Sequence, residues 1–222
     1  MAAGSFRVGV TNRTRAGLAA ALLALAGCTT AQRPEAPRPS VAVEPQPAWR
    51  SLVKPADLSR LGGSAAAWSK GLDTARRAGF AQSLRKEGSL FDPAAALAVP
   101  APAPGAYRCR LFRLGAGTRG RRAFSLEGSF FCFISAEGGQ LKFVRETGAP
   151  RPIGFLYPAD EASLIFLGAT AERRETSVPA YGDRAERDVV GTMQRIDNFR
   201  YRLVLPWRGK TPLEIYDLVP AL

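Results

Sequence analysis

The chain has 222 residues, of which 46% are hydrophobic and 23% charged, a composition that is ordinary for a globular protein and argues against global disorder. Its formal net charge of +12 favours anionic partners such as phosphates, acidic lipids, nucleic acid or acidic proteins. Because most of the basic residues are Arg, the charge also fits a compositional bias without any binding role. Histidine is absent, which excludes Ser-His-Asp and Cys-His catalytic sites within this chain.

Residues 1–27 predict a secretory signal peptide. Three basic residues, Arg7, Arg13 and Arg15, precede an uncharged apolar run from Ala16 to Gly27. The run is about 12 residues long, whereas a membrane-spanning helix needs roughly 20. Removal of this segment would lower the formal charge from +12 to +9.

The tetrapeptide Leu25-Ala26-Gly27-Cys28 resembles the lipoprotein box of bacterial lipoproteins. In that family the Cys sulfur carries a diacylglycerol, the signal is cut before the Cys, and the new amino group is acylated. The resemblance therefore implies a membrane anchor on Cys28 with several acyl chains such as palmitate, which hold far better than one chain. Thr29 follows Cys28, whereas Asp at this position is the usual signal for retention in the inner membrane. The resemblance therefore implies that the protein is anchored at the periplasmic face of the outer membrane. The alternative is a plain signal peptide with an incidental Cys.

Three segments follow this box. Residues 28–47 contain five Pro and predict an extended tether, because Pro can neither continue a helix nor pair within a sheet. Residues 48–91 predict a helical segment: a short helix from Lys54 to Leu61, a second from Ser64 to Gly79, and a third turn after it. Residues 92–105 are rich in Ala and Pro and predict a linker.

Residues 106–222 predict an antiparallel β domain. Apolar side chains alternate in the clearest runs, with Phe130, Cys132 and Ile134 on one face, and no helical pattern intervenes. The fold class is therefore α+β, with short helices packed on or beside a small barrel or sandwich of about eight strands. The predicted strands are 107–114, 129–135, 140–147, 152–157, 163–169, 189–196, 200–206 and 213–219.

Two cysteines remain after Cys28, namely Cys109 and Cys132. An exported protein meets an oxidising compartment, so an even pair of cysteines predicts a disulfide between the first two strands. Two buried thiols or a redox site are the alternatives, although the CxxC spacing of redox sites is absent.

Two loops carry candidate chemistry. Gly115 to Gly120 matches G-x-G-x-x-G, but a strand rather than a helix follows, so we interpret this basic segment as a hairpin loop. In the segment 145–154, Arg145, Thr147, Gly148 and Arg151 form a candidate binding site, because Arg suits bidentate binding of carboxylate or phosphate. The alternative is a structural turn in which Arg145 or Arg151 pairs with a nearby acid.

Several short stretches, in this order, resemble a bacterial family built on the domain of unknown function 4893. They are Tyr107-Arg108-Cys109-Arg110, Cys132, Thr147-Gly148 followed by Arg151 and Gly154, Leu167-Gly168, Tyr181-Gly182, Val190-Gly191, Arg202-Leu203-Val204-Leu205-Pro206, and Leu218-Val219-Pro220. The family has no assigned activity, so the resemblance implies no catalytic residues. The chain departs from it at Ala149-Pro150, where the family has a polar pair.

We therefore expect a lipid-anchored cell-envelope protein whose β domain is a non-enzymatic binding or structural module. The expected partners are the membrane, through Cys28, and an anionic ligand or an envelope protein; neither nucleic acid, nor a cofactor, nor a metal is expected. One alternative, by analogy with small lipid-anchored barrels, is a lipocalin-like ligand carrier or a protease inhibitor. Another is a periplasmic hydrolase using carboxylates.

Overall fold

The computed structural model describes residues 48–115, 123–148, 150–172, 175, 177–206 and 213–221. Cys28 and the basic loop 116–122 lie outside these residues. The helical segment forms what we call the helical arm, residues 49–91. Its elements are α1 (Trp49–Leu52), α2 (Pro55–Gly62), α3 (Ser64–Ala75), a π-type turn η1 (Arg76–Phe80), α4 (Ala81–Lys86) and a 3₁₀ turn η2 (Gly88–Phe91).

Local sequence signals set the boundaries of the arm. Pro55 occupies the first turn of α2, where its missing N–H has no intrahelical partner to lose. Gly79 adopts φ 91° within η1, a left-handed conformation that a glycine takes without steric cost, and the chain kinks there before α4. The predicted short helix, longer helix and third turn are thus present.

Eight strands follow the arm, close to the predicted ranges. They are β1 (Gly105–Leu114), β2 (Phe124–Glu137), β3 (Gln140–Arg145), β4 (Arg151–Asp160), β5 (Ser163–Ala171), β6 (Asp188–Asp197), β7 (Arg200–Pro206) and β8 (Leu213–Pro220). Each pairs antiparallel with the next in sequence.

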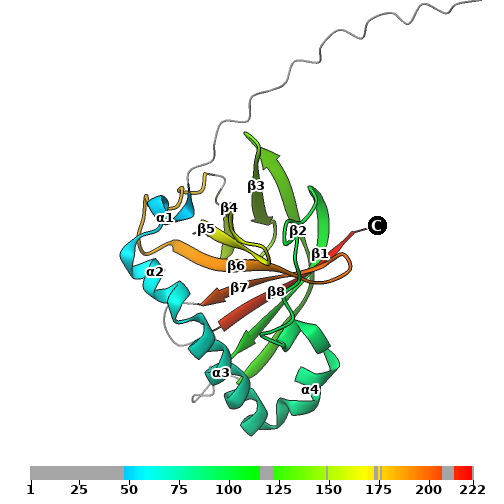
Figure 1. Ribbon diagram of the computed structural model, residues 1–222. Coiled ribbons are helices and arrows are strands. Elements are labelled where there is room, and N and C mark those ends of the chain that lie inside the picture. The colour runs from blue at the N-terminus through cyan, green and yellow to red at the C-terminus, as the bar shows by residue number, and fades with distance from the viewer. Residues whose placement is uncertain are drawn as a thin grey trace, which may run out of the picture. The chain divides into compact units, whose positions relative to one another are not determined.

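The sheet closes on itself, so the fold is a barrel and not a sandwich. β8 returns to pair antiparallel with β1, with Cys109 opposite Leu218 and Leu111 opposite Tyr216. In Figure 1 the two strands lie side by side, although they come from opposite ends of the β domain. Closure removes the exposed sheet edges that would otherwise invite pairing with another chain.

The barrel interior is filled by side chains. One buried cluster draws residues from all eight strands, and in a closed barrel only the interior can bring these together. Its members are Tyr107, Cys109, Leu111, Cys132, Ile134, Phe143, Leu156, Leu164, Phe166, Val189, Met193, Tyr201, Leu203, Leu205, Tyr216 and Leu218. The predicted disulfide joins Cys109 and Cys132 inside this cluster, with 6.0 Å between their Cα atoms.

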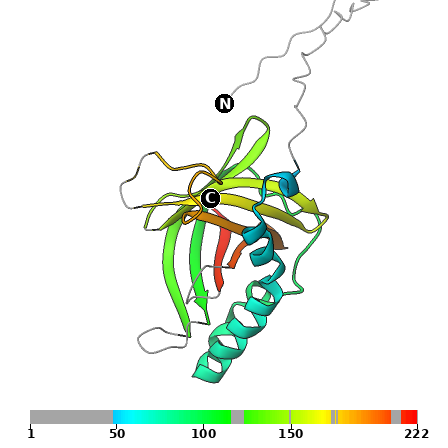
Figure 2. The same ribbon diagram turned by 90° about the vertical axis from the view of Figure 1, so that its left-hand side faces the viewer.

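The helical arm packs on the outside of the barrel through two further cores (Figure 2). In one, Trp68 and Leu72 of α3 and Phe91 of η2 meet outward residues of β1, β6, β7 and β8. In the other, Trp49 of α1 packs on Tyr157, Ile165, Leu167 and Val190. Every residue of β5 is therefore buried, since the interior covers one face and the second outer core the other.

Residues 92–104 run along the barrel after the arm. Leu97 forms a bridge to Arg195 of β6, and the Val99 N–H donates to the Glu161 carbonyl at 3.0 Å. All three cores lie between Trp49 and Leu218. Within the described part of the chain, no helix has the length and apolar character needed to cross a membrane.

Candidate functional site

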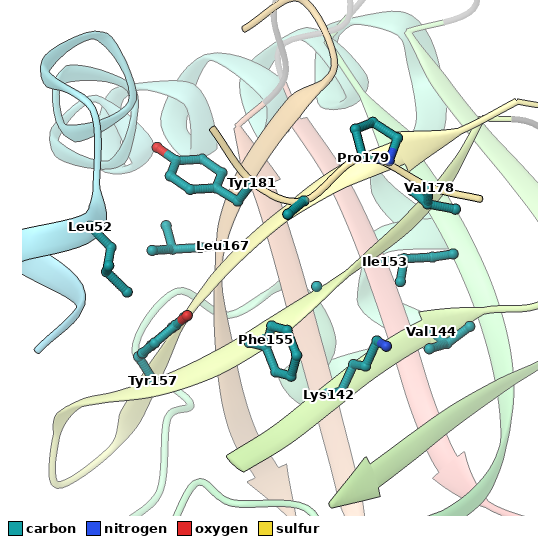
Figure 3. Close-up of a pocket in the computed structure, with 12 residues that line it drawn as sticks. Leu52, Lys142, Val144, Ile153, Phe155, Tyr157, Leu167, Val178, Pro179 and Tyr181 are labelled. Atoms are coloured by element: carbon teal, nitrogen blue, oxygen red, sulfur yellow. The ribbon is translucent and has the colours of Figure 1, made fainter. Parts of the chain in front are cut away.

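A groove with a volume of about 610 Å³ lies on the outer wall of the barrel. Its floor is the outward face of β3, β4 and β5, and its sides are α1 and the segment 178–181 that precedes β6 (Figure 3). We call it the wall groove. It is lined by Leu52, Lys142, Val144, Ile153, Gly154, Phe155, Tyr157, Leu167, Val178, Pro179, Ala180 and Tyr181.

The period-two alternation of the strands explains why the floor of the groove is apolar. On β4, Gly154 and Leu156 face the interior, so Ile153, Phe155 and Tyr157 face outward. The helical arm covers outward apolar residues on β1, β6, β7 and β8, but between α1 and segment 178–181 it leaves this patch open. An apolar concavity of this volume falls in the range of small-molecule sites.

Two polar groups lie on either side of Phe155 in the wall groove (Figure 3). The Lys142 ammonium is 5.5 Å from the centre of the Phe155 ring and pairs with Glu137 at 3.1 Å. The Tyr157 hydroxyl forms no hydrogen bond with any residue that the structure describes. Lys142 is the one charged residue in the described lining, so the groove offers a cation and a free hydroxyl to a ligand.

A partly buried polar clasp fixes the side of the groove formed by segment 178–181. The Tyr181 hydroxyl donates to the Asp57 carboxylate at 2.6 Å and accepts from the Lys54 N–H at 3.0 Å. The Lys54 ammonium pairs with Asp188 at 3.2 Å and donates to the Gly182 carbonyl at 2.7 Å. Burial, followed by the hydrogen bond to Asp57, raises the pKa of Tyr181 above its usual value. The clasp therefore holds α2 and segment 178–182 together as one wall.

The end of the barrel where β1 finishes and β8 begins is called the barrel mouth. Arg145, the first residue of the predicted binding segment, lies there. It is 2% exposed, and its guanidinium lies 4.2 Å from the centre of the Phe130 ring. It donates to Glu127, to the Thr147 carbonyl at 2.6 Å and to the Tyr216 hydroxyl at 3.4 Å. Arg145 is thus paired with an acid inside the barrel, as we expect for a structural turn and not for a ligand-binding loop.

Thr147, Gly148 and Arg151 make contacts within the protein. Thr147 contributes its backbone carbonyl to Arg145, and Gly148 lies against the Arg145 guanidinium with φ 94°. Arg151 donates to the carbonyls of Glu146 at 2.8 Å and Glu175 at 2.9 Å. The segment forms a turn in which both Arg side chains bond to protein groups.

Two carboxylates also meet at the barrel mouth. Arg113 donates to Glu214 at 2.7 Å and to Glu127 at 3.1 Å, so one guanidinium joins both acids. Burial raises the pKa of Glu214, and the nearby Arg113 opposes that rise. Among the described residues, no three Cys, Asp or Glu side chains come together in a way that could hold a metal ion.

No sequence pattern points directly to the wall groove. Val144, Ile153 and Phe155 alternate with interior residues, but an outward apolar residue on a strand looks the same whether a helix covers it or not. Tyr181 enters the sequence argument only through the family resemblance. Its role in the clasp depends on Asp57, which lies 124 positions earlier in the chain.

Comparison with known proteins identifies the fold unit. The model of one family, described as Domain of unknown function (DUF4893), matches residues 49–218, which span the helical arm and all eight strands. No curated protein and no solved structure matches the chain. Since the match covers well over half of the sequence and includes every residue of the three cores, the chain belongs to the DUF4893 family.

Proposed function

We propose that this protein is a lipid-anchored cell-envelope protein whose barrel is a non-enzymatic binding module. Its ligand is a small amphipathic molecule with an apolar body and one anionic group, held in the wall groove. The observation that carries the proposal is the composition of the groove: an apolar lining from three strands, α1 and segment 178–181, with Lys142 as its single charge.

The size and polarity of the groove support this ligand class. A volume of about 610 Å³ suits a small molecule, and the aromatic and aliphatic lining would bury an apolar body. Lys142 and the Tyr157 hydroxyl, on either side of Phe155, supply a cation and a hydrogen-bond donor for an anionic group. The clasp around Tyr181 prepares the wall in advance, which lowers the ordering cost of binding.

The same observations weigh against the two alternative functions. A lipocalin-like carrier holds its ligand inside the barrel, but here the interior is packed with side chains from all eight strands. A hydrolase needs a carboxylate free to transfer a proton, whereas Glu127 and Glu214 are both bound to Arg113. We therefore favour binding at the outer wall.

The groove is tested with 8-anilinonaphthalene-1-sulfonate, an aromatic anion whose fluorescence rises in apolar sites. We expect one saturable site that Lys142→Gln weakens about fivefold and that Ala180→Trp, which fills the groove, abolishes. Lys70→Gln and Ala78→Trp make the same changes on exposed helical surface and should leave binding unchanged. If the two control variants weakened binding as much as the two groove variants, or if no saturable site were found, the groove would not be the ligand site.

The anchor is tested separately in a bacterial host. We expect the full chain to fractionate with membranes and to yield a mature N-terminus at Cys28 that carries acyl chains by mass spectrometry. Cys28→Ser should abolish acylation and leave the protein either released or uncut. Unchanged mass and membrane fractionation in Cys28→Ser would rule out lipidation at this residue.

A further inference from the structure

A second surface, which adjoins the wall groove where Phe133 of β2 lies opposite Val144 of β3, combines exposed apolar side chains with arginines. On the outer face of the barrel, Arg108 of β1 lies opposite Phe131 of β2 on one side and opposite Val219 of β8 on the other. Phe133 is the next outward residue of β2. We call Arg108, Phe131, Phe133 and Val219 the arginine–aromatic face.

The apolar members of this face are exposed. Phe131, Phe133 and Val219 are 49%, 37% and 38% exposed, and Arg108 between them is also exposed. Further along β1, outward Phe112 and Leu114 are fully buried because the helical arm covers them. The arm therefore covers one half of the outer surface of β1 and leaves the other half open, which Figure 1 shows as the uncovered side of β1 and β2.

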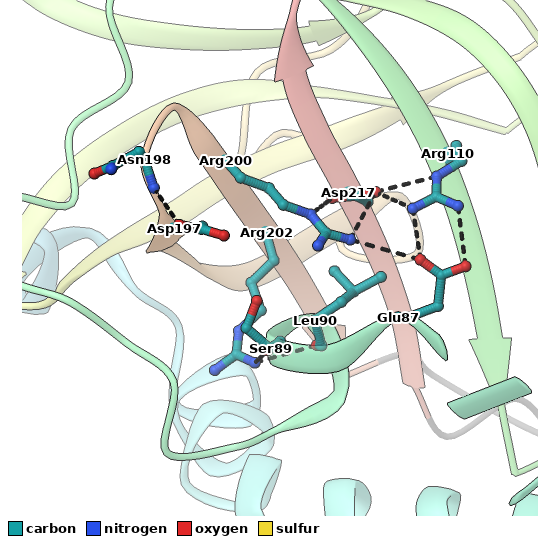
Figure 4. A network of polar contacts seen from close by, with 9 residues as sticks. All are labelled: Glu87, Ser89, Leu90, Arg110, Asp197, Asn198, Arg200, Arg202 and Asp217. Atoms are coloured by element: carbon teal, nitrogen blue, oxygen red, sulfur yellow. Dashed lines mark hydrogen bonds and ion pairs between the residues drawn. The ribbon is translucent and has the colours of Figure 1, made fainter. Parts of the chain in front are cut away.

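An ion cluster borders the face (Figure 4). Arg110 bonds to Asp217 at 2.5 Å and to Glu87 at 2.7 Å, and Arg200 bonds to Asp217 at 2.8 Å and reaches Glu87 at 3.6 Å. Two cations and two carboxylates thus neutralise one another. The cluster fixes the two guanidinium groups at the edge of the open surface.

Arg108 is the uncompensated charge. It lines a shallow depression of about 500 Å³ together with the ion cluster and Ser129, so that three arginines face two acids there. No described acid pairs with Arg108. The depression consequently carries a surplus positive charge beside three exposed apolar side chains.

We propose that the arginine–aromatic face docks on a membrane surface, with Arg108 on the phosphate of an anionic phospholipid and Phe131, Phe133 and Val219 in the boundary between headgroups and acyl chains. Surface-binding proteins use this pairing, because basic groups gain electrostatic attraction while apolar side chains gain burial. This inference goes beyond the groove. The docking proposal uses the proposed anchor in one respect: a lipid on Cys28 would keep the barrel near a bilayer.

The charge and shape of the face favour a membrane as its occupant. A strand surface of exposed Phe and Val around a lone Arg suits a fluid anionic surface, which needs no complementary shape. A dimer with its two-fold axis at Arg108 would place this arginine against its own copy, which like-charge repulsion disfavours. A membrane therefore fits both the apolar and the charged members of the face.

The test uses residues 28–222 with Cys28→Ser, which lack the lipid and keep all three cores intact. Co-sedimentation is measured with vesicles of phosphatidylcholine alone and with about 30% phosphatidylglycerol. We expect binding only to the anionic vesicles, falling as salt rises. Arg108→Gln should weaken it about fivefold, and Phe131→Ser about fivefold as well.

Matched variants make the result specific. Arg77→Gln removes an exposed arginine from the helical arm, and Leu58→Ser removes a side chain that is 48% exposed on α2. Both should bind like the parent. The proposal is overturned if the parent does not bind anionic vesicles, or if Arg77→Gln weakens binding as much as Arg108→Gln. Binding of millimolar inorganic phosphate at Arg108 without binding of vesicles would also overturn it. So would a dimer of the parent that the Phe131 and Arg108 substitutions dissociate. Because no lipid is attached, failure here leaves the Cys28 anchor and the groove untouched.

Discussion

Gly154 and Gly168 face each other across β4 and β5, and each occupies the place where a side chain of the other would stand. A Cβ on Gly168 would lie 2.8 Å from the Gly154 Cα, and a Cβ on Gly154 would overlap the Gly168 Cα. The Phe166 ring fills the space beside Gly168, where a Cβ would lie 2.6 Å from its Cζ atom. The strands can bend tightly here only because neither residue carries a side chain, which is how small barrels form their corners.

Gly154→Ala should therefore lower the free energy of unfolding by about 3 kcal/mol, since the added methyl group meets backbone rather than a movable side chain. Urea unfolding measures the change. Gly128→Ala, at an exposed position of β2 with no atom within 4 Å of the new Cβ, is the control and should shift stability by less than about 0.5 kcal/mol. Equal effects at the two positions would contradict a steric role for Gly154.

The strand pattern was predictable because it is local. Phe130, Cys132 and Ile134 alternate with outward residues, and the structure places all three on the interior side of β2. Closure was not predictable, because a sandwich and a barrel differ in whether β8 pairs with β1, about one hundred positions away. Period-two alternation is identical in both folds.

The site was harder to predict for the same reason. The sequence left open whether Arg145 binds a ligand or pairs with a nearby acid, because the acid it meets, Glu127, lies on another strand. The wall groove depends on which outward residues the helical arm leaves uncovered. A stripe of outward Ile153, Phe155 and Tyr157 gives no sign of this choice, because covered strands carry the same residue types.

Breaking the Cys109–Cys132 disulfide should destabilise the barrel. The two residues are 23 positions apart, and the chain-entropy model gives about 3 kcal/mol for a loop of this size. Urea unfolding of the double variant Cys109→Ala, Cys132→Ala should show this loss. Because both cysteines are fully buried, reductant should shift the unfolding midpoint of the parent while alkylation of the folded protein stays slow. An identical midpoint with and without reductant would argue against the bond.

Tyr107 should limit stability at high pH. Its hydroxyl donates to the Ala103 carbonyl at 2.7 Å, and burial, followed by the charge of Tyr201, raises its pKa from 10.0 to about 12. A phenol whose pKa is raised by folding contributes stability that is complete below pH 10 and is lost as the pH rises from 10 to 12. Tyr107→Phe should cost about 1 kcal/mol at pH 7. Unfolding in urea between pH 7 and 12 should show this difference shrinking; a constant difference would contradict the assignment.

Arg202 should hold the end of the helical arm on the barrel. It is fully buried on the outer face of β7, 5.1 Å from the centre of the Trp68 ring. Its guanidinium donates to the carbonyls of Ser89, Leu90, Asp92 and Pro93, and to Gln194 at 2.8 Å. Burial lowers its pKa to about 10, so it remains charged at neutral pH.

Arg202→Leu should lower stability by about 3 kcal/mol, because it leaves the buried Leu90 carbonyl and three partly buried carbonyls without this donor. It should also speed hydrogen exchange in residues 88–95 before any strand exchanges faster, since those carbonyls anchor this turn. Arg195→Leu removes a half-buried arginine that bonds to the Ala98 carbonyl and should cost less than about 1 kcal/mol. If exchange in residues 88–95 were unchanged in Arg202→Leu, the arm would be held by the apolar contacts of Trp68, Leu72 and Phe91 alone.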